Sequence, residues 1–230
     1  MMNIDYYFIF PDGTEKIIKI ELDADSLEIK TEIPALMPDW VLISNCQCDI
    51  CPLTNGNMIY CPIALNISVP IEFFKDYNSF DEVEVTVKTD IRDYYKRTTV
   101  QKSLSSLLGV YMVASGCPVM KKLKPMVRFH LPFASVEETI TRVTGTYLLG
   151  QYFLNKQGKP ADLELNNLIG FYKGIQNINM GIADRIRGIA GKDALNNAVI
   201  CLDIFAKELP YAIEDELEDI KHLFSAYWDN

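Results

Sequence analysis

The amino-acid sequence predicts an α+β protein, in which a small antiparallel sheet with a cysteine metal loop precedes a bundle of about four helices. Three observations carry this prediction: two hairpin-like segments of alternating apolar residues, four cysteines within 16 residues, and apolar residues at helical spacing throughout the second half. We expect a β-rich part at 1–100 and a helical part at 101–230, either as two domains or as one.

Two hairpins account for the predicted sheet. Apolar side chains alternate over residues 4–10 and 18–22, and the turn residues Pro-Asp-Gly at 11–13 lie between them. A strict alternation over 82–88 predicts a third strand, and residues 94–97 are its expected antiparallel partner.

The segment between the hairpins is less regular. The apolar run at 40–43 is interpreted as a short strand that leads into the cysteines. Pro62 suits the first turn of a short helix, and Ser68 followed by Pro70 predicts a second one that buries Ile71 and Phe74.

The second half carries several helix signals. Thr98 with Gln101, and Ser135 with Glu138, have the form of capping boxes. Gly116 stands where a C-terminal glycine is expected. Long apolar stripes then run over 165–189, 195–206 and 213–224, and breaks are predicted at Gly158, Gly191 and Pro210; we assign these stripes to core packing.

Composition and charge exclude several classes of protein. Hydrophobic residues make up 49% and charged residues 23%, the balance of a packed globular domain rather than a disordered chain. No apolar run reaches the roughly 18 residues of a membrane span, and no signal peptide is evident, so we expect a cytoplasmic protein without membrane association. The net charge of −9 argues against nucleic acid as a partner.

Six cysteines are present, and their spacing favours a metal site. Cys46, Cys48, Cys51 and Cys61 lie close together in the sequence, while Cys117 follows the predicted helix end at Gly116. In a cytoplasmic chain such clustering indicates metal ligation rather than disulfides. Cys201 lies beside an apolar stripe and is interpreted as a core thiol.

Two ligand sets are compatible with this spacing. One is the local set of Cys46, Cys48, Cys51 and Cys61. The other replaces Cys46 by Cys117 and is slightly favoured, because it would tie the sheet half to the helical half. His130 is a reserve ligand. Zinc is the expected ion for a closed four-thiolate site, an iron–sulfur cluster is the alternative, and the remaining reading is free or redox thiols without metal.

The chain also contains one basic segment. Between Arg92 and His130 there are eight lysines and arginines and a single acid. This is either a solvated face or an anion-attracting surface. If residues 126–133 are extended, Arg128 and His130 point the same way and could hold a carboxylate or phosphate together with Lys121, Lys122 and Lys124.

Several segments resemble a family of uncharacterised bacterial proteins. The resembling segments are QCDICPL at 47–53, CPIA at 61–64, SGCP at 115–118 and RFHLPFA at 128–134, and the similarity extends to the hairpin around 11–13. The resemblance implies that Cys48, Cys51, Cys61 and Cys117 belong to the family motifs and that Cys46 does not. It implies no activity.

These observations lead to one hypothesis and two alternatives. The hypothesis is a zinc-binding protein of regulatory or binding function, with a basic surface for a small anionic ligand or an acidic protein partner. The first alternative is a metal- or iron–sulfur-dependent enzyme or redox protein that uses Arg128 and His130 for substrate. The second is an assembly factor that binds another chain through its helical half.

Overall fold

The computed structural model describes residues 1–30, 36–53, 58–189 and 191–228, and it confirms the α+β class. The strands are β1 (Met2–Ile9), β2 (Glu15–Leu22), β3 (Glu82–Thr89) and β4 (Asp93–Thr99). They form one antiparallel sheet in the order β2-β1-β3-β4. Because β1 pairs with β3, Tyr6 lies opposite both Ile18 and Val87, and the two predicted hairpins join edge to edge.

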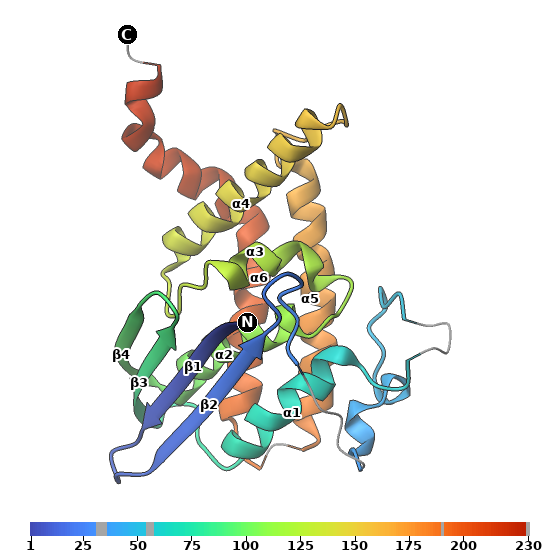
Figure 1. Cartoon of the computed structure of the whole chain (residues 1–230), viewed down its shortest axis with the longest axis vertical. Helices are drawn as coiled ribbons and strands as arrows, with labels where there is room; N and C mark the ends of the chain where they lie inside the picture. The colour runs from blue at the N-terminus through green and yellow to red at the C-terminus, as the bar shows by residue number, and fades with distance from the viewer. Residues whose placement is uncertain (31–35, 54–57, 190, 229–230) are drawn as a thin grey trace.

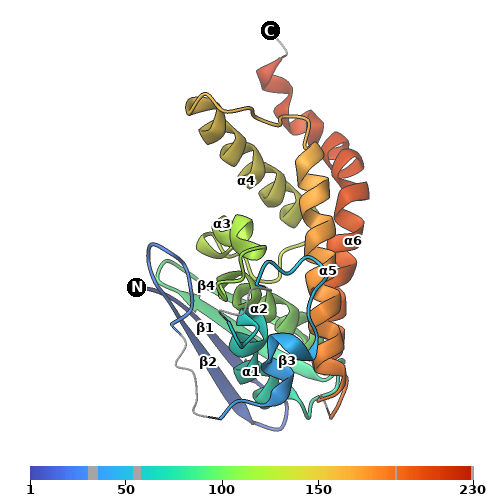
Figure 2. The ribbon, with the colours of Figure 1, turned by 90° about the vertical axis from the view of Figure 1, so that its right-hand side faces the viewer.

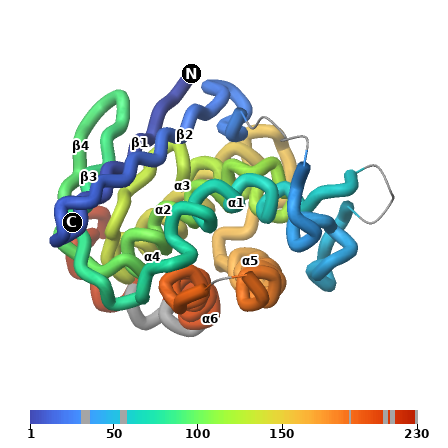
Figure 3. Tube along the Cα trace, turned by 90° about the horizontal axis from the view of Figure 1, so that it is seen from below, coloured from blue at the N-terminus to red at the C-terminus, as the bar shows by residue number. Residues whose placement is uncertain are grey.

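The helices form two further layers behind this sheet. The α-helices are α1 (Pro62–Phe74), α2 (Val100–Ala114), α3 (Lys124–Arg128), α4 (Val136–Lys156), α5 (Asn166–Arg187) and α6 (Ala194–Ile220). The 3-10 helices are η1 (Asp39–Val41), η2 (Ile43–Asn45), η3 (Met120–Leu123) and η4 (Lys221–Tyr227). Helices α1 and α2 lie between the sheet and the long α5–α6 pair, while α4 leans away from the sheet (Figures 1, 2 and 3). Among the described helices, none combines the length and the apolar composition that a bilayer crossing requires.

The alternation in the strands determines which face of the sheet is buried. Ile4, Tyr6 and Phe8 are fully buried, whereas their neighbours in β1 are partly or largely exposed. The Phe8 ring meets that of Phe74 on α1, with centroids 4.8 Å apart. Most of the buried apolar residues form one contiguous cluster from Met2 to Ile213, which draws on both predicted parts of the chain. The division of the chain into a β-rich part at 1–100 and a helical part at 101–230 stays a prediction.

Two predictions for the segment between the hairpins are wrong. Residues 40, 41 and 43 lie in η1 and η2 rather than in a strand, and Leu42 between them forms an isolated bridge with Tyr60, the segment's one ladder contact among the described residues. The two short helices expected around Pro62 and Pro70 are one helix, α1, with Pro70 inside it. The helix continues past the proline because Ile71 and Phe74 are buried.

The helix signals of the second half are partly confirmed. The Ser135–Glu138 capping box is present at the start of α4, and Gly116 has a positive φ of 85° after α2. The Thr98 box is wrong, because β4 runs on to Thr99, which is the N-cap residue of α2 and makes no side-chain cap. Helix α6 also runs on past Pro210, where a break was expected.

Helix α5 accommodates the cysteine loop through its glycines. A Cβ atom built on Gly181 would lie 2.8 Å from Cys48 Sγ, and one on Gly174 would lie 3.2 Å from Ile50 Cδ1. The two glycines are seven residues apart and therefore share a helix face. The loop thus packs directly on the α5 backbone, and a Cβ atom at Gly181 would displace the Cys48 thiol.

We expect Gly181→Ala to lower the free energy of unfolding by about 1–2 kcal/mol, because overpacking against Cys48 outweighs the gain in helix propensity. Gly170→Ala, in the same helix, is the matched control: its Cβ would meet nothing within 4 Å, so it should stabilise by up to about 1 kcal/mol. Urea unfolding measures the change in the free energy of unfolding for each variant. Equal changes in the two variants would refute the packing argument.

Candidate metal centre

Four cysteines from three segments line one small cavity. They are Cys48, Cys51, Cys61 and Cys117, and the cavity has a volume of about 20 Å³. Cys48 and Cys51 follow η2, Cys61 is the N-cap residue of α1, and Cys117 lies beyond the end of α2. The set favoured from the sequence is therefore the set that meets at this cavity, and Cys46 is not among its lining residues.

Local backbone geometry presents each of these thiols. The Cys51 amide donates to the Cys48 carbonyl oxygen at 2.9 Å, which closes a turn between the two. The Cys61 amide donates to the Val41 carbonyl oxygen at 2.8 Å and so fixes the start of α1. The positive φ of Gly116 reverses the chain after α2, and the Cys117 amide then donates to Ser115 Oγ at 3.2 Å. Short-range turns and helix ends thus converge on the cavity.

Arg185 on α5 holds the loop that carries Cys48 in place. Its side chain is only 4% exposed and lines the same cavity. Its guanidinium donates to the carbonyl oxygens of four loop residues: Trp40 at 2.5 Å, Leu42 at 2.6 Å, Ile43 at 3.3 Å, and Cys46. Within the described part of the chain it has no carboxylate partner, and its Nε has no hydrogen-bond partner. A buried positive charge without a counter-ion therefore lies beside the thiols.

The surroundings of the cavity favour the protonated form of Cys48 and Cys117. Burial raises the pKa of Cys48 to about 12, and the neighbouring Cys61 and Cys51 raise it further, while Arg185 opposes the shift. Burial also raises the pKa of Cys117. A cation that binds here must displace thiol protons.

The side chains do not adopt ligand geometry in this structure. Within the described residues, no three histidine, cysteine, aspartate or glutamate side chains are close enough together to hold a metal ion. The four thiols share a cavity, but they would have to turn toward a common point to bind an ion. All six cysteines are free thiols.

The other candidate ligands, Cys46 and His130, do not line the cavity. The carbonyl oxygen of Cys46 accepts from Arg185. The Nε2 atom of His130 is 2.7 Å from the hydroxyl of Tyr6, which also lies 2.9 Å from Ser106 Oγ. Cys201 lines a separate, larger cleft, and burial raises its pKa.

The five residues of the predicted anion site have separate surroundings. Lys124 pairs with Glu28 at 2.9 Å, Lys122 lies over the ring of Phe171, and Arg128 donates to Met2 Sδ at 3.5 Å. Lys121 is exposed, and His130 is partly buried. The expectation that 126–133 is extended is wrong, because α3 occupies Lys124–Arg128. The anion site itself stays a prediction.

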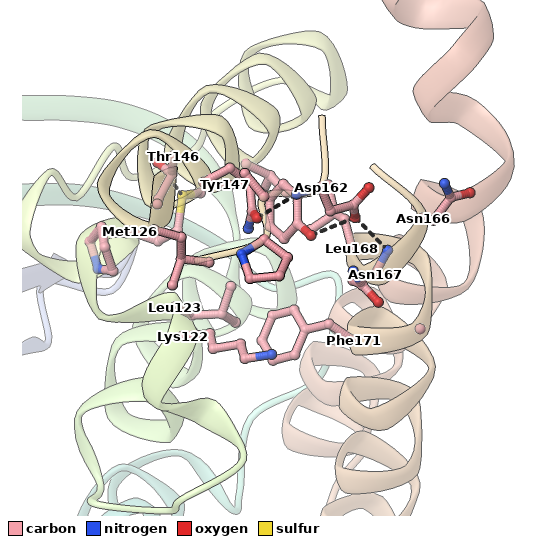
Figure 4. A pocket seen from close by; sticks show the side chains of 18 residues that line it. Lys122, Leu123, Met126, Thr146, Tyr147, Asp162, Asn166, Asn167, Leu168 and Phe171 are labelled. Carbon is pink, nitrogen blue, oxygen red and sulfur yellow. Dashed lines mark hydrogen bonds between the residues drawn. The ribbon is translucent and has the colours of Figure 1, made fainter. Parts of the chain in front are cut away.

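A large cleft of about 730 Å³ lies between α4 and α5 (Figure 4). Its polar groups bond to one another: Tyr147 donates to Asp162 at 2.7 Å, and the amide of Asp162 donates to Gln151 Oε1 at 2.9 Å. None of the buried unpartnered polar atoms of the described residues lines it. The described lining of this cleft therefore holds no buried, unpartnered side-chain atom that would point to a ligand.

Sequence reasoning missed Arg185 and Gly181, although signals for both were present. Arg185 follows Ile178 and Ile182 at seven and three residues, so it stands on the buried stripe of α5, where a basic residue needs an explanation. Gly174 and Gly181 are seven residues apart, a spacing that leaves one face of the helix without side chains at these two positions.

His130 should make stability depend on pH. Burial, together with the nearby Arg142, lowers the pKa of His130 to about 3. In the unfolded chain a histidine titrates near 6.5, so below that pH the unfolded state binds more protons and the folded state loses stability. We expect a loss of about 1–1.5 kcal/mol between pH 6.5 and 5 that His130→Gln abolishes, as measured by urea unfolding. The same pH slope in the variant would contradict this assignment.

Comparison with known proteins gives a family but no activity. No curated protein and no solved structure is significantly similar to the chain. A family model described as "Domain of unknown function (DUF6901)" matches residues 4–225, a range that includes the cysteine loop, α5 and most of the helical half. The chain therefore belongs to the DUF6901 family.

Proposed function

We propose that this protein binds one zinc ion through Cys48, Cys51, Cys61 and Cys117, and that the ion has a structural or regulatory rather than a catalytic role. The observation that carries the proposal is the convergence of four thiols, from three separate segments, on one cavity. Four protein thiolates complete the tetrahedral coordination of zinc and leave no open position for a substrate.

The size of the cavity supports a single ion over an iron–sulfur cluster. A volume of roughly 10–15 Å³ is enough for one water molecule. The cavity, at about 20 Å³, has room for one small guest such as a single ion. A cluster of several iron and sulfide ions would need the loop to move outward from α5, against which Cys48 and Ile50 are packed.

The charges beside the cavity also support this assignment. Zinc with four thiolates carries a net charge of −2, which is costly to bury unless it is compensated. Arg185 supplies a buried positive charge beside the thiols. Replacement of the thiol protons by zinc would give this guanidinium the counter-charge that it otherwise lacks.

The zinc would join parts of the chain that are far apart in the sequence. It would tie the loop after η2 to the start of α1 and to the residue beyond α2, beside α5. Loss of the metal would therefore release the loop. Thiol ligation requires reduced cysteines, which supports a cytoplasmic location, where thiols are kept reduced.

Metal analysis of the protein purified under reducing conditions tests the proposal. We expect about one zinc per chain and a colourless protein. Cys117→Ser should lower the zinc content severalfold, because it removes one of four ligands. Cys46→Ser and Cys201→Ser are the matched controls and should retain the metal, since neither residue lines the cavity.

Three results would contradict the proposal: no bound metal, full zinc content in Cys117→Ser, or a brown protein with iron and sulfide. Exchange for Co²⁺ provides a second measurement, because tetrahedral thiolate coordination gives that ion intense visible absorption. A weaker absorption in Cys117→Ser than in Cys46→Ser is the expected outcome.

A further inference from the structure

We propose that a second cleft, distinct from the cysteine cavity, binds a small amphipathic carboxylate. This cleft has a volume of about 720 Å³ and lies between α2, the segment from η3 to α4, and the α5–α6 pair. Pockets for small molecules commonly span about 300–1,000 Å³. It shares no lining residue with the cysteine cavity. On α5, Ile178 lines the cavity and the adjacent Asn179 lines the cleft.

Most of the wall of the cleft is apolar. Met112, Met120, Phe133 and Val143 line it from four different segments of the chain. Such a wall favours a ligand whose main part is aliphatic or aromatic. Flexible methionine side chains adapt to varied apolar shapes.

One buried hydrogen-bond donor in this wall has no partner. Asn179 is 2% exposed, and its Nδ2 forms no hydrogen bond within the part of the chain that the structure describes. A buried donor without an acceptor is unfavourable, and native structures rarely retain one. A ligand oxygen that inserts into the wall at Asn179 would satisfy this amide.

The charges that line the cleft select a negatively charged oxygen. Lys96 and Lys102 are exposed at the cleft and form no ion pair in the described part of the chain, and Arg142 adds a third cation. Glu138 is the single acid in the lining, and its carboxylate already accepts from the Ser135 amide at 2.7 Å. The cleft is therefore basic on a chain of net charge −9.

Together these features define the ligand class. The carboxylate would accept a hydrogen bond from Asn179, within the positive field of the three cations, and the apolar body would lie against the methionines. This site differs from the anion site predicted from the sequence, with which it shares only His130. The low pKa of that histidine keeps it neutral at pH 7.

Isothermal titration of the full chain with octanoate, octan-1-ol and acetate tests the proposal. We expect octanoate to bind at least about tenfold more tightly than octan-1-ol, because a hydrogen bond to a charged group is stronger than one to a neutral group. Acetate, which lacks the apolar body, should not bind detectably. Equal affinities for octanoate and octan-1-ol, or no binding of octanoate at millimolar concentration, would overturn the proposal.

Variants locate the site. Asn179→Leu should weaken octanoate binding about tenfold and leave octan-1-ol within about twofold. The surface double variant Lys96→Glu/Lys102→Glu should weaken octanoate about fivefold or more. Lys19→Glu reverses the charge of an exposed lysine on β2, away from the cleft, and should leave the octanoate affinity unchanged. If Asn179→Leu does not fold, the lysine variant decides, and unchanged octanoate affinity in that variant sinks the proposal.

Discussion

The hydrogen bonding of Arg185 is the constraint on which the cysteine region depends. Residues 39–46 form two short 3-10 turns, and they direct several carbonyl oxygens toward one guanidinium on α5. That single side chain adds to the two backbone hydrogen bonds by which Val41 and Ile43 pair with the segment before α1. The position of Cys48 follows from it, since the same loop then lies against the bare backbone at Gly181.

The rest of the fold is built outward from this contact. The sheet and the α5–α6 pair enclose α1 and α2, whose ends carry Cys61 and Cys117. Two helix ends and one loop therefore meet where the middle and outer layers touch. Helix α4 packs less closely on the other helices, and the two large clefts lie on either side of a wall shared by Leu123, Met126 and Val143.

The elements with a strong local period could be predicted from the sequence, and those set by tertiary contacts could not. The alternation in β3 and the Ser135 capping box depend on neighbouring residues alone. Residues 40–43 look like a strand because they are apolar, but three of their carbonyl oxygens accept hydrogen bonds from Arg185, far along the chain. The spacing of Cys48, Cys51 and Cys61 also indicated that they are neighbours. The burial of Asn179, in contrast, depends on helix packing that no local pattern encodes.

The glycines of α5 have a consequence for the order of folding. Gly170, Gly174 and Gly181 each lower helix propensity by about 1 kcal/mol relative to alanine, so α5 is a poor helix on its own. Its helical state therefore depends on tertiary contacts, including those that Gly174 and Gly181 permit with the cysteine loop. The helix should become ordered late, together with the docking of the cysteine loop, whereas the β1–β2 hairpin, whose contacts are local, can form early.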